Sequence, residues 1–227
     1  MDKRFAIILG IIVVVAGGLI FFRGGDKAKS NAQPTNNIYG KSDVGVTLVE
    51  YGDLECPACG QYYPLVKQLK TDFDGHVAFQ YRNFPLETIH AHALVAARYA
   101  QAAALQGKFF EMHDLMYENQ QTWAQAADPT VYFVTYAQQL GLNTAKLKTD
   151  ANSSATNNVI NADIAAGNVY KISGTPTFVL DGKKIDNPRD LDSFRKLLND
   201  EIVAKGGKAV VLTSTSSNAP TTTQTHQ

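Results

Sequence analysis

The chain has 227 residues and is 44% hydrophobic, which is enough for one ordinary domain with a full core once its two ends are set aside. Its 21 Lys and Arg residues balance 21 Asp and Glu residues, so no bulk charge favours nucleic acid, and nucleic-acid binding receives no support. Only two cysteines occur, Cys56 and Cys59. They lie too close together to stabilise the fold by closing a long loop, so they indicate chemistry rather than structure.

The first predicted element is a membrane segment within residues 1–23. No charged residue interrupts the run from Phe5 to Phe22, which makes a helix of about 27 Å, close to the thickness of a bilayer core. A cleavable export signal is the alternative, since Lys3 and Arg4 precede the run. We favour an uncleaved anchor, because no small-x-small cleavage site lies near its end, although the flanking charges leave the orientation open. We expect a single-pass protein of the cell membrane, with its folded domain outside the cytoplasm.

Two polar segments flank the predicted folded domain. Residues 24–42 are rich in Gly, Asn, Ser, Lys and Gln, a composition typical of a flexible linker. Residues 206–227 end in a run of Ser, Thr, Asn, Gln and Pro, and we expect this tail to be disordered. The folded domain is therefore predicted to span residues 43–205.

The folded domain is predicted to begin with a strand, a helix and a second strand. Val44 to Tyr51 is dense in Val and Leu, as expected of a strand in a sheet covered on both faces. A helix begins at Cys56, because Pro57 has the missing N–H and the fixed φ that suit the first helical position. Pro64 falls inside this helix and predicts a kink. Apolar and polar residues then alternate from Val77 to Arg82, which predicts the second strand.

Helices fill the middle of the chain, and a hairpin and a last helix follow. Apolar spacing predicts helices over Thr88–Gln106, over Phe109–Glu118 and from Asp128-Pro129 to Leu140-Gly141, with more helix toward Val169. Thr177–Leu180 and Lys183–Ile185 are predicted to pair as a hairpin, because Asp181-Gly182 supplies the positive φ values of a type I′ turn. The last helix follows Asp190 and ends at Gly206-Gly207.

The two cysteines are predicted to have different reactivities. A thiolate, and not a thiol, attacks or leaves in disulfide exchange. At the start of a helix, the sulfur of Cys56 faces unpaired backbone N–H groups and the positive end of the helix dipole, which lower the pKa of a thiol. Cys59 lies one turn later, close enough to form a disulfide and more deeply buried. Cys56 is therefore the predicted reactive thiol, and Cys59 the resolving thiol.

The order of strand, Cys-x-x-Cys, helix and late hairpin resembles the thioredoxin superfamily. The resemblance narrows to the DsbA-like oxidoreductases of bacterial envelopes through motifs that span nearly the whole domain: Asp53-Leu54-Glu55-Cys56-Pro57-Ala58-Cys59-Gly60, Phe84-Pro85-Leu86, Gln106-Gly107-Lys108-Phe109, Met112-His113-Asp114 and Gly174-Thr175-Pro176-Thr177-Phe178. It implies an α/β, thioredoxin-like fold with a helical insertion after the second core strand, at about residues 86–169.

The resemblance also implies roles for residues outside the dithiol. Pro176 is expected to follow a cis peptide bond, and Thr175 to pair through its backbone with an extended substrate peptide. Pro57 and Ala58, which separate the cysteines, complete the predicted substrate-binding set. Glu50 stands where this superfamily keeps a buried acid beneath the disulfide, and it is expected to exchange a proton with the second cysteine.

The predicted function is a thiol:disulfide oxidoreductase that needs no cofactor. We expect it to oxidise dithiols in exported proteins that carry free cysteines, and a membrane thiol oxidase to reoxidise it. A reductase or isomerase would use the same site in another direction. A tethered peptide-binding module or a copper chaperone would use it without turnover, although the lack of nearby Met or His ligands argues against copper.

Structural interpretations compete at several other residues. No third cysteine completes a zinc site with the pair, and His90 and His92 point to different sides of a helix, so no metal is expected. His113 is predicted to be packed and hydrogen-bonded, and Glu55 to be exposed. An ion-paired Glu50 without a catalytic part is the alternative to its predicted role. The spacing of Phe109, Phe110, Met112 and Met116 favours core packing over a partner surface.

Overall fold

A computed structural model describes residues 31–212 of the chain. The chain divides into two units, Met1–Asn31 and Ala32–Gln227, and the described residues belong almost wholly to the second. The predicted membrane segment Phe5–Phe22 lies outside the described residues, as does the first part of the predicted linker. Across residues 31–212, none of the helices combines the length and the apolar character that a bilayer crossing requires.

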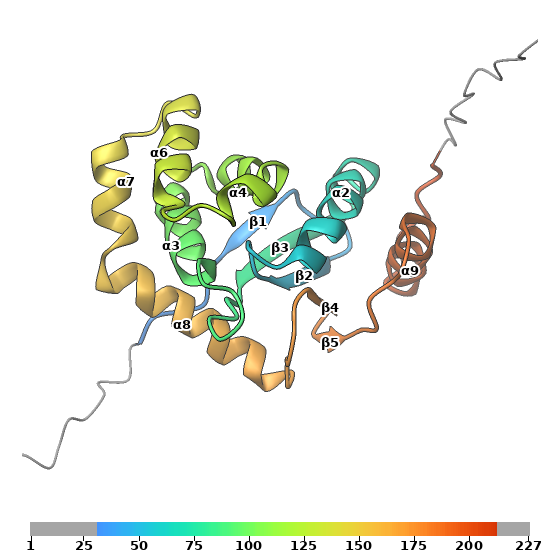
Figure 1. The fold of residues 1–227 in the computed structure, drawn as a ribbon. Coiled ribbons are helices and arrows are strands. Elements are labelled where there is room, and N and C mark those ends of the chain that lie inside the picture. Colours follow the sequence, from blue (N-terminus) through green and yellow to red (C-terminus); the bar gives the residue numbers. More distant parts are fainter. Residues whose placement is uncertain (1–30, 213–227) are drawn as a thin grey trace, which may run out of the picture. The chain divides into compact units, whose positions relative to one another are not determined.

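The second unit is built on one five-stranded sheet with the strand order β1-β3-β2-β4-β5 (Figure 1). The strands are β1 (Asn37–Tyr39), β2 (Val46–Gly52), β3 (Val77–Asn83), β4 (Thr177–Leu180) and β5 (Lys183–Lys184). β2 and β3 run parallel, whereas β1 and β4 pair antiparallel to them. The two predicted core strands are therefore confirmed, each with ends shifted by one or two residues. Positive φ at Asp181 and Gly182 confirms the predicted hairpin turn.

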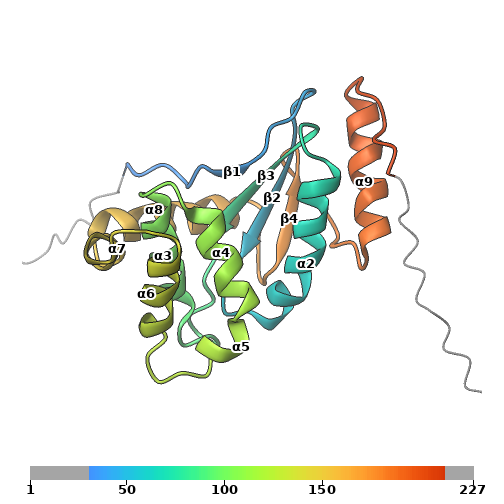
Figure 2. The same cartoon turned by 90° about the horizontal axis from the view of Figure 1, so that it is seen from above.

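Two helices cover one face of the sheet. α2 (Pro57–Asp72) follows β2, and α9 (Leu191–Ala204) ends the fold, with Asp190 capping it as predicted through a bond from the Ser193 N–H. Figure 2 shows both helices on the same side of the strands. Their apolar residues share one core with the sheet: Val66, Leu69 and Phe73 of the α2 region, Phe194, Leu198 and Ile202 of α9, and Leu48, Phe79 and Phe178 of the strands. Each fully buried side chain of this size contributes about 1.5–3 kcal/mol to folding.

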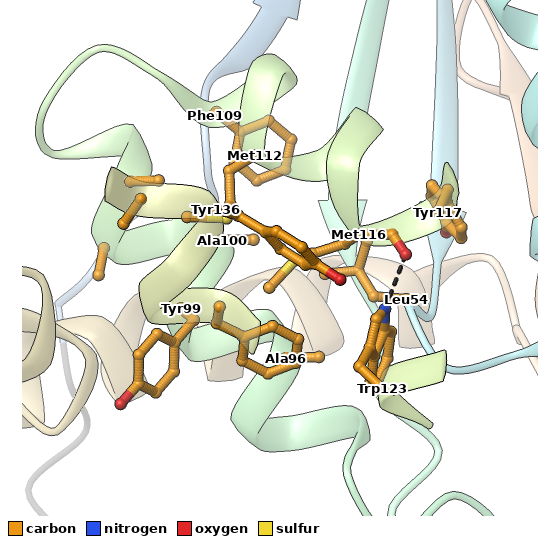
Figure 3. Close-up of a cluster of buried hydrophobic side chains, with 14 of the residues drawn as sticks. Leu54, Ala96, Tyr99, Ala100, Phe109, Met112, Met116, Tyr117, Trp123 and Tyr136 are labelled. Carbon is orange, nitrogen blue, oxygen red and sulfur yellow. Dashed lines mark hydrogen bonds between the residues drawn. The ribbon is translucent and has the colours of Figure 1, made fainter. Parts of the chain in front are cut away.

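The helical insertion lies between β3 and β4. It comprises α3 (Ala93–Ala104), α4 (Phe109–Glu118), α5 (Gln120–Trp123), α6 (Thr130–Gln139), α7 (Thr144–Ala151) and α8 (Ser154–Val169). Its core surrounds Trp123, whose indole N–H donates to the Met116 carbonyl over 2.7 Å (Figure 3). Met112 and Met116 are fully buried there and Phe109 is nearly so, which confirms the prediction that this helix face packs inward.

The first predicted helix of the insertion begins later than expected. Residues Thr88–His92 precede α3 and make turns, in which the Ile89 and His90 N–H groups both donate to the Leu86 carbonyl. Ile89, the first apolar residue of the predicted helical pattern, is 70% exposed. Side-chain carboxylates from the β2–α2 connection bind the backbone of this segment, and these tertiary contacts override its helical pattern. The prediction of one helix over Thr88–Gln106 was therefore wrong at its start.

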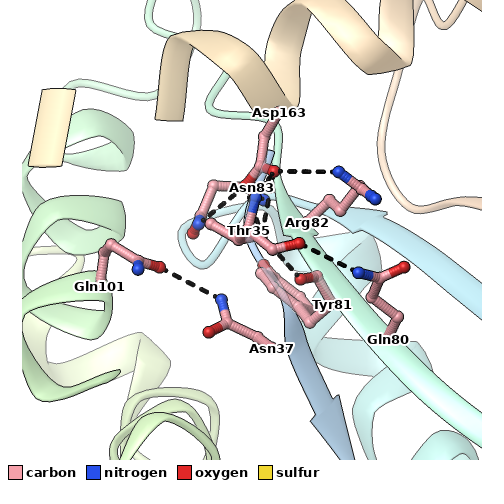
Figure 4. A network of polar contacts seen from close by, with 8 residues as sticks. All are labelled: Thr35, Asn37, Gln80, Tyr81, Arg82, Asn83, Gln101 and Asp163. Carbon is pink, nitrogen blue, oxygen red and sulfur yellow. Dashed lines mark hydrogen bonds and ion pairs between the residues drawn. The ribbon is translucent and has the colours of Figure 1, made fainter. Parts of the chain in front are cut away.

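The segment before β2 is part of the fold, although residues 24–42 were predicted to form a linker. β1 pairs with β3, and Thr35 is buried. The Thr35 N–H and hydroxyl both donate to the carboxylate of Asp163 in α8, which also accepts from the Asn83 N–H over 2.9 Å (Figure 4). The linker prediction was wrong for this stretch because polar composition does not reveal a partner supplied from far along the chain.

The predicted tail is also ordered at its beginning. The Val210 N–H donates to the Asn199 side chain over 2.7 Å, and the Asn199 amide donates back to the Val210 carbonyl. Val210 and Leu212 pack against the core that α2 and α9 share. The prediction of disorder for 206–227 was therefore wrong for residues 206–212, and the remainder lies outside the described residues.

Candidate active site

Cys56 is the N-cap residue of α2, so the helix begins at Pro57, one residue after the predicted start. Its backbone is extended, with φ −65° and ψ 121°, and Pro57 occupies the first helical turn. The Gly60 N–H donates to the Cys56 carbonyl over 3.1 Å, which closes the first turn. The backbone N–H groups of Ala58 and Cys59, which have no partner within the helix, favour a negative charge on the Cys56 sulfur.

These donors stabilise a thiolate at Cys56. A hydrogen bond from the Cys59 thiol has the largest effect; burial opposes it, and the Thr175 hydroxyl and the two backbone N–H groups add to it. Together they lower the pKa of Cys56 from 9.0 to about 5. At neutral pH the reduced site therefore carries a thiolate, and the structure supplies it without the help of a side chain at Ala58.

Cys59 has the opposite environment. Its side chain is fully buried, and burial, the hydrogen bond that it gives to Cys56 and the charge of Glu50 all raise its pKa well above 9.0. Both cysteines are free thiols in this structure. One sulfur is thus an anion that can attack or leave, while its neighbour holds its proton.

Thr175 and Pro176 close the site from the other side. The peptide bond between them is cis, as the resemblance implies. The Cys56 thiol contacts the Thr175 carbonyl oxygen at 3.4 Å. The Thr175 hydroxyl is buried and has no hydrogen-bond partner within residues 31–212, and it favours the thiolate form of Cys56. The segment before β4 therefore contacts the reactive sulfur through its backbone, and its side chain lowers the pKa of that sulfur.

Pro57 and Ala58 form the outer rim of the site. Pro57 is exposed and Ala58 is half-buried, so both are accessible to a polypeptide that reacts at Cys56. The structure thus brings the predicted residues Pro57, Ala58, Thr175 and Pro176 together around one sulfur. Their assignment to substrate binding stays a prediction.

Glu50 lies in β2 and is buried, with 6% of its surface exposed. Burial raises its pKa from 4.5 to about 7; the charge of Lys70 opposes this rise and that of Cys56 adds to it. Because the charge of Glu50 also acts on Cys59, the carboxyl is near enough to sense the resolving thiol. A group that titrates near neutral pH beside a buried thiol is suited to proton exchange, although the role stays a prediction.

Sequence reasoning missed Lys70, the cation of this site. Lys70 is 8% exposed, and its ammonium lies 4.3 Å from the centre of the Phe110 ring and 5.4 Å from that of Tyr39. Burial lowers its pKa, against the charges of Asp114 and Glu50. The side chains of Lys70 and Glu50 line the same narrow cleft, together with those of Gln80, Tyr81 and His113. A lysine on an amphipathic helix gives no local signal of burial, because its depth depends on which elements pack over it.

Sequence reasoning also missed the side chain that fixes the active-site loop from the insertion. The Gln120 amide, at the start of α5, donates to the Leu54 carbonyl over 2.8 Å and to the Cys56 carbonyl over 2.9 Å. A side chain at Gly60 would clash with Gln120, since a Cβ there would lie 2.5 Å from its amide oxygen. The glycine after the second cysteine was the available signal, because close approach of a neighbouring group is a common reason for a glycine.

The two histidines considered as metal ligands contact different residues. His90 binds the Asp53 carboxylate, and His92 contributes its backbone N–H to Glu55, which is half-buried rather than exposed as predicted. No group of three or more His, Cys, Asp and Glu side chains within residues 31–212 is placed to hold a metal ion. His113 is buried and bonded to Asp114, which confirms its structural interpretation.

Comparison with known proteins identifies the family. Residues 32–200 match the family described as Thioredoxin. Among curated proteins, the Na(+)/H(+) antiporter NhaA 3 of Salinispora tropica is 35% identical over 159 residues, which are 70% of this chain and 24% of the antiporter. The chain thus spans about a quarter of such relatives, and their name describes much longer proteins.

Solved structures show the same fold. BdbD from Bacillus subtilis, in its oxidised form, superposes with a TM-score of 0.66 at 23% identity, over 76% of this chain and 97% of BdbD. The α-DsbA1 protein of Wolbachia pipientis gives a TM-score of 0.65 at 18% identity, over 76% of this chain and 94% of that protein. The chain therefore belongs to the thioredoxin family, and its fold is that of the DsbA-type proteins with which it superposes.

Proposed function

We propose that this protein oxidises dithiols of exported proteins, with the Cys56–Cys59 disulfide as the electron acceptor. The observation that carries the proposal is the pKa of Cys56, which lies at about 5 against 9.0 for an ordinary cysteine. Stabilising this thiolate stabilises the reduced protein, so the disulfide gains electrons more readily. This stabilisation of the reduced state supports electron flow from the substrate to the protein.

The exchange proceeds in two steps. A substrate thiolate attacks the Cys56 sulfur, the bond between the cysteines breaks, and Cys59 leaves with the electron pair and takes a proton. The high pKa of Cys59 makes that proton necessary, and Glu50 is the buried acid suited to deliver it. The second substrate thiolate then attacks the substrate sulfur of the mixed disulfide. Cys56 leaves as the stabilised thiolate, and the substrate keeps the new disulfide.

The substrate binds as an extended chain beside Cys56. The backbone of Thr175 pairs with it by strand addition, and Pro176, Pro57 and Ala58 shape the surface around the reacting sulfur. Support comes from the position of the Thr175 carbonyl, 3.4 Å from Cys56, and from the exposed Pro57. The polypeptide is thereby held where its thiol reaches only the outer of the two cysteines.

The protein works outside the cytoplasm and is held at the membrane by the Phe5–Phe22 segment. A membrane thiol oxidase reoxidises Cys56 and Cys59, and tethering raises the effective concentration at which the two meet. Support comes from the uncharged run itself, which matches the thickness of a bilayer core. Fractionation of the full chain from cells, with and without alkaline extraction, tests whether it is an integral membrane protein.

Titration of the dithiol against glutathione buffers tests the direction of the reaction. The proposal predicts a reduction potential well above the value of about −270 mV that is typical of thioredoxin. A value near that of thioredoxin would favour a reductase instead. If no reversible disulfide forms, neither enzymatic role stands.

Two cysteine variants test the assignment of the thiols. Cys59→Ser should accumulate mixed disulfides with substrate, because the attacking thiol remains and the resolving thiol is gone. Cys56→Ser should form none, and gel analysis without reductant separates the two outcomes. Equal loss of function without trapping in Cys59→Ser would contradict the assignment.

A further inference from the structure

A histidine lies against the active-site loop, and the chemistry described so far does not use it. The segment after β3 contacts the β2–α2 connection at three points. The Leu86 N–H donates to the Asp53 carboxylate over 2.9 Å, His90 Nδ1 lies 2.7 Å from the same oxygen, and the His92 N–H donates to Glu55 over 2.6 Å. These contacts hold His90 in one place beside the loop.

Asp53 connects this histidine to the redox centre. Its carboxylate is fully buried and also accepts from the Glu55 N–H over 2.8 Å. Its own carbonyl accepts the Cys56 N–H over 3.1 Å, and its backbone N–H favours a charge on Cys59. Asp53 therefore links the His90 side chain to the backbone that positions the sulfurs of Cys56 and Cys59.

The charges that face His90 all favour its protonation. They belong to Asp53, Glu55 and Cys56 of the β2–α2 connection, while Glu87 and His92 stand on its own segment. Burial disfavours the imidazolium, but the Asp53 hydrogen bond and the three negative charges outweigh it and raise the pKa of His90 above 6.5. The His90 side chain is 15% exposed, so it can exchange a proton with water.

The dithiol reaction leaves one proton unassigned. Oxidation of a substrate dithiol to a disulfide releases two electrons and two protons. The reduced protein takes both electrons, but its sulfurs take only one proton, because Cys59 is a thiol and Cys56 stays a thiolate at neutral pH. The other proton goes to solvent or to a base near the new negative charge.

We propose that His90 takes up this proton in a fraction of the molecules: reduction of the disulfide creates the Cys56 thiolate, and the imidazole held by Asp53 becomes an imidazolium that stabilises it. Neutral His90 gains the proton in the reduced state and returns it when the disulfide reforms. Asp53 holds the ring in position for this exchange. The inference rests on the dithiol chemistry of the proposed function and not on its direction.

The test is an NMR titration of the histidine rings in the full chain, in its oxidised and reduced forms. The pKa of His90 should be higher by about half a unit or more in the reduced form, where it faces one more negative charge. His76 is a matched control, because its Nδ1 also pairs with a carboxylate, Asp43, at 3.1 Å, and within residues 31–212 no hydrogen bond or ion pair joins it to either cysteine. Equal His90 pKa values in the two redox states would overturn the inference.

A variant adds a second measurement. His90→Gln keeps a hydrogen bond to Asp53 without a titrating charge, and it should raise the pKa of Cys56 by about half a unit. His76→Gln should leave that pKa unchanged. An unchanged Cys56 pKa in folded His90→Gln would also overturn the inference, and the wild-type titration stands if the variant does not fold. A thioredoxin-like potential would reject the oxidase direction and leave the His90 difference in place, so the two failures are distinguishable.

Discussion

Two buried carboxylates, Asp163 of α8 and Glu50 of β2, have opposite surroundings. Asp163 of α8 accepts hydrogen bonds from Thr35 and Asn83 at 2.7 to 3.3 Å, and the Arg82 guanidinium lies 3.5 Å away. The carboxyl of Glu50 in β2 has no hydrogen-bond partner within residues 31–212, and its pKa depends on burial and on the charges of Lys70 and Cys56. Burial raises the pKa of both carboxyls.

The difference separates a structural acid from a chemical one. Buried carboxylates normally have partners, because an unpaired charge in the interior is costly. Asp163 follows this rule, and its partners join the chain before β1, β3 and the insertion (Figure 4). The carboxyl of Glu50 breaks the rule near enough to the dithiol for its charge to act on Cys59, where a group that gives up and regains a proton near neutral pH is useful. Substitution of each residue tests whether this contrast holds.

Removal of Asp163 should have the largest effect on stability. Asp163→Ala leaves the Thr35 and Asn83 donors without an acceptor, and it should lower the free energy of unfolding by about 3–5 kcal/mol in a urea titration. The pKa of Cys56 should not change. Asp200→Ala is the control, since Asp200 is an exposed partner of Lys196 and its loss should cost little. A mild effect of Asp163→Ala would show that these contacts do not hold the N-terminal segment.

Removal of the Glu50 charge should raise the free energy of unfolding at pH 8, whereas removal of Asp163 should lower it. Because the pKa of Glu50 is about 7 in the folded protein against 4.5, the native state binds more protons across this window, and the free energy of unfolding should fall by about 3 kcal/mol as pH rises through it. Glu50→Gln should abolish this fall and stabilise the protein by about that amount at pH 8. It should also slow release of Cys59 during exchange.

Urea titrations from pH 4 to 8, together with stopped-flow exchange kinetics, measure both effects of Glu50→Gln. Glu118→Gln is the control, because Glu118 is exposed and Lys67 lowers its pKa by a hydrogen bond. If Glu50→Gln destabilised the protein at pH 8, Glu50 would be a paired structural acid like Asp163.

Thr175 offers the smallest and most local test. Its hydroxyl resembles Glu50 in lacking a structural partner, and it faces the Cys56 sulfur. Thr175→Val keeps the shape and removes the donor, so the pKa of Cys56 should rise by about one unit. Thr135→Val, on the exposed side of α6, should leave that pKa unchanged. An unchanged pKa of Cys56 in Thr175→Val would mean that the start of α2 and Cys59 alone stabilise the thiolate.

Local sequence signals sufficed for the centre of this site. The dithiol, its position at a helix start and the proline before β4 each depend on residues that are close together in the sequence. Their signals are therefore present in short stretches of the chain. Lys70 and Gln120 were not predictable in this way, because their contacts join α2 to Phe110 and α5 to the Cys56 carbonyl. A side chain that acts through a distant element leaves no periodic or spacing signal.

The fold shows the same division between local and distant contacts. The Asp181-Gly182 turn and the helix over Phe109–Glu118 follow from residues within each element, and both were predicted with their ends nearly correct. β1 was missed because its three residues lie among polar neighbours and form a strand only by pairing with β3. Residues Thr88–His92 were assigned to a helix because their pattern gives no sign of the carboxylates that bind their backbone.

The central claim is that the start of α2 and its neighbours stabilise a thiolate at Cys56. The most direct measurement is the ultraviolet absorbance of the thiolate as a function of pH in the reduced full chain, with Cys56→Ser to assign the transition. The account predicts a transition near pH 5. A single transition at about pH 8.5, as in a free cysteine, would contradict it.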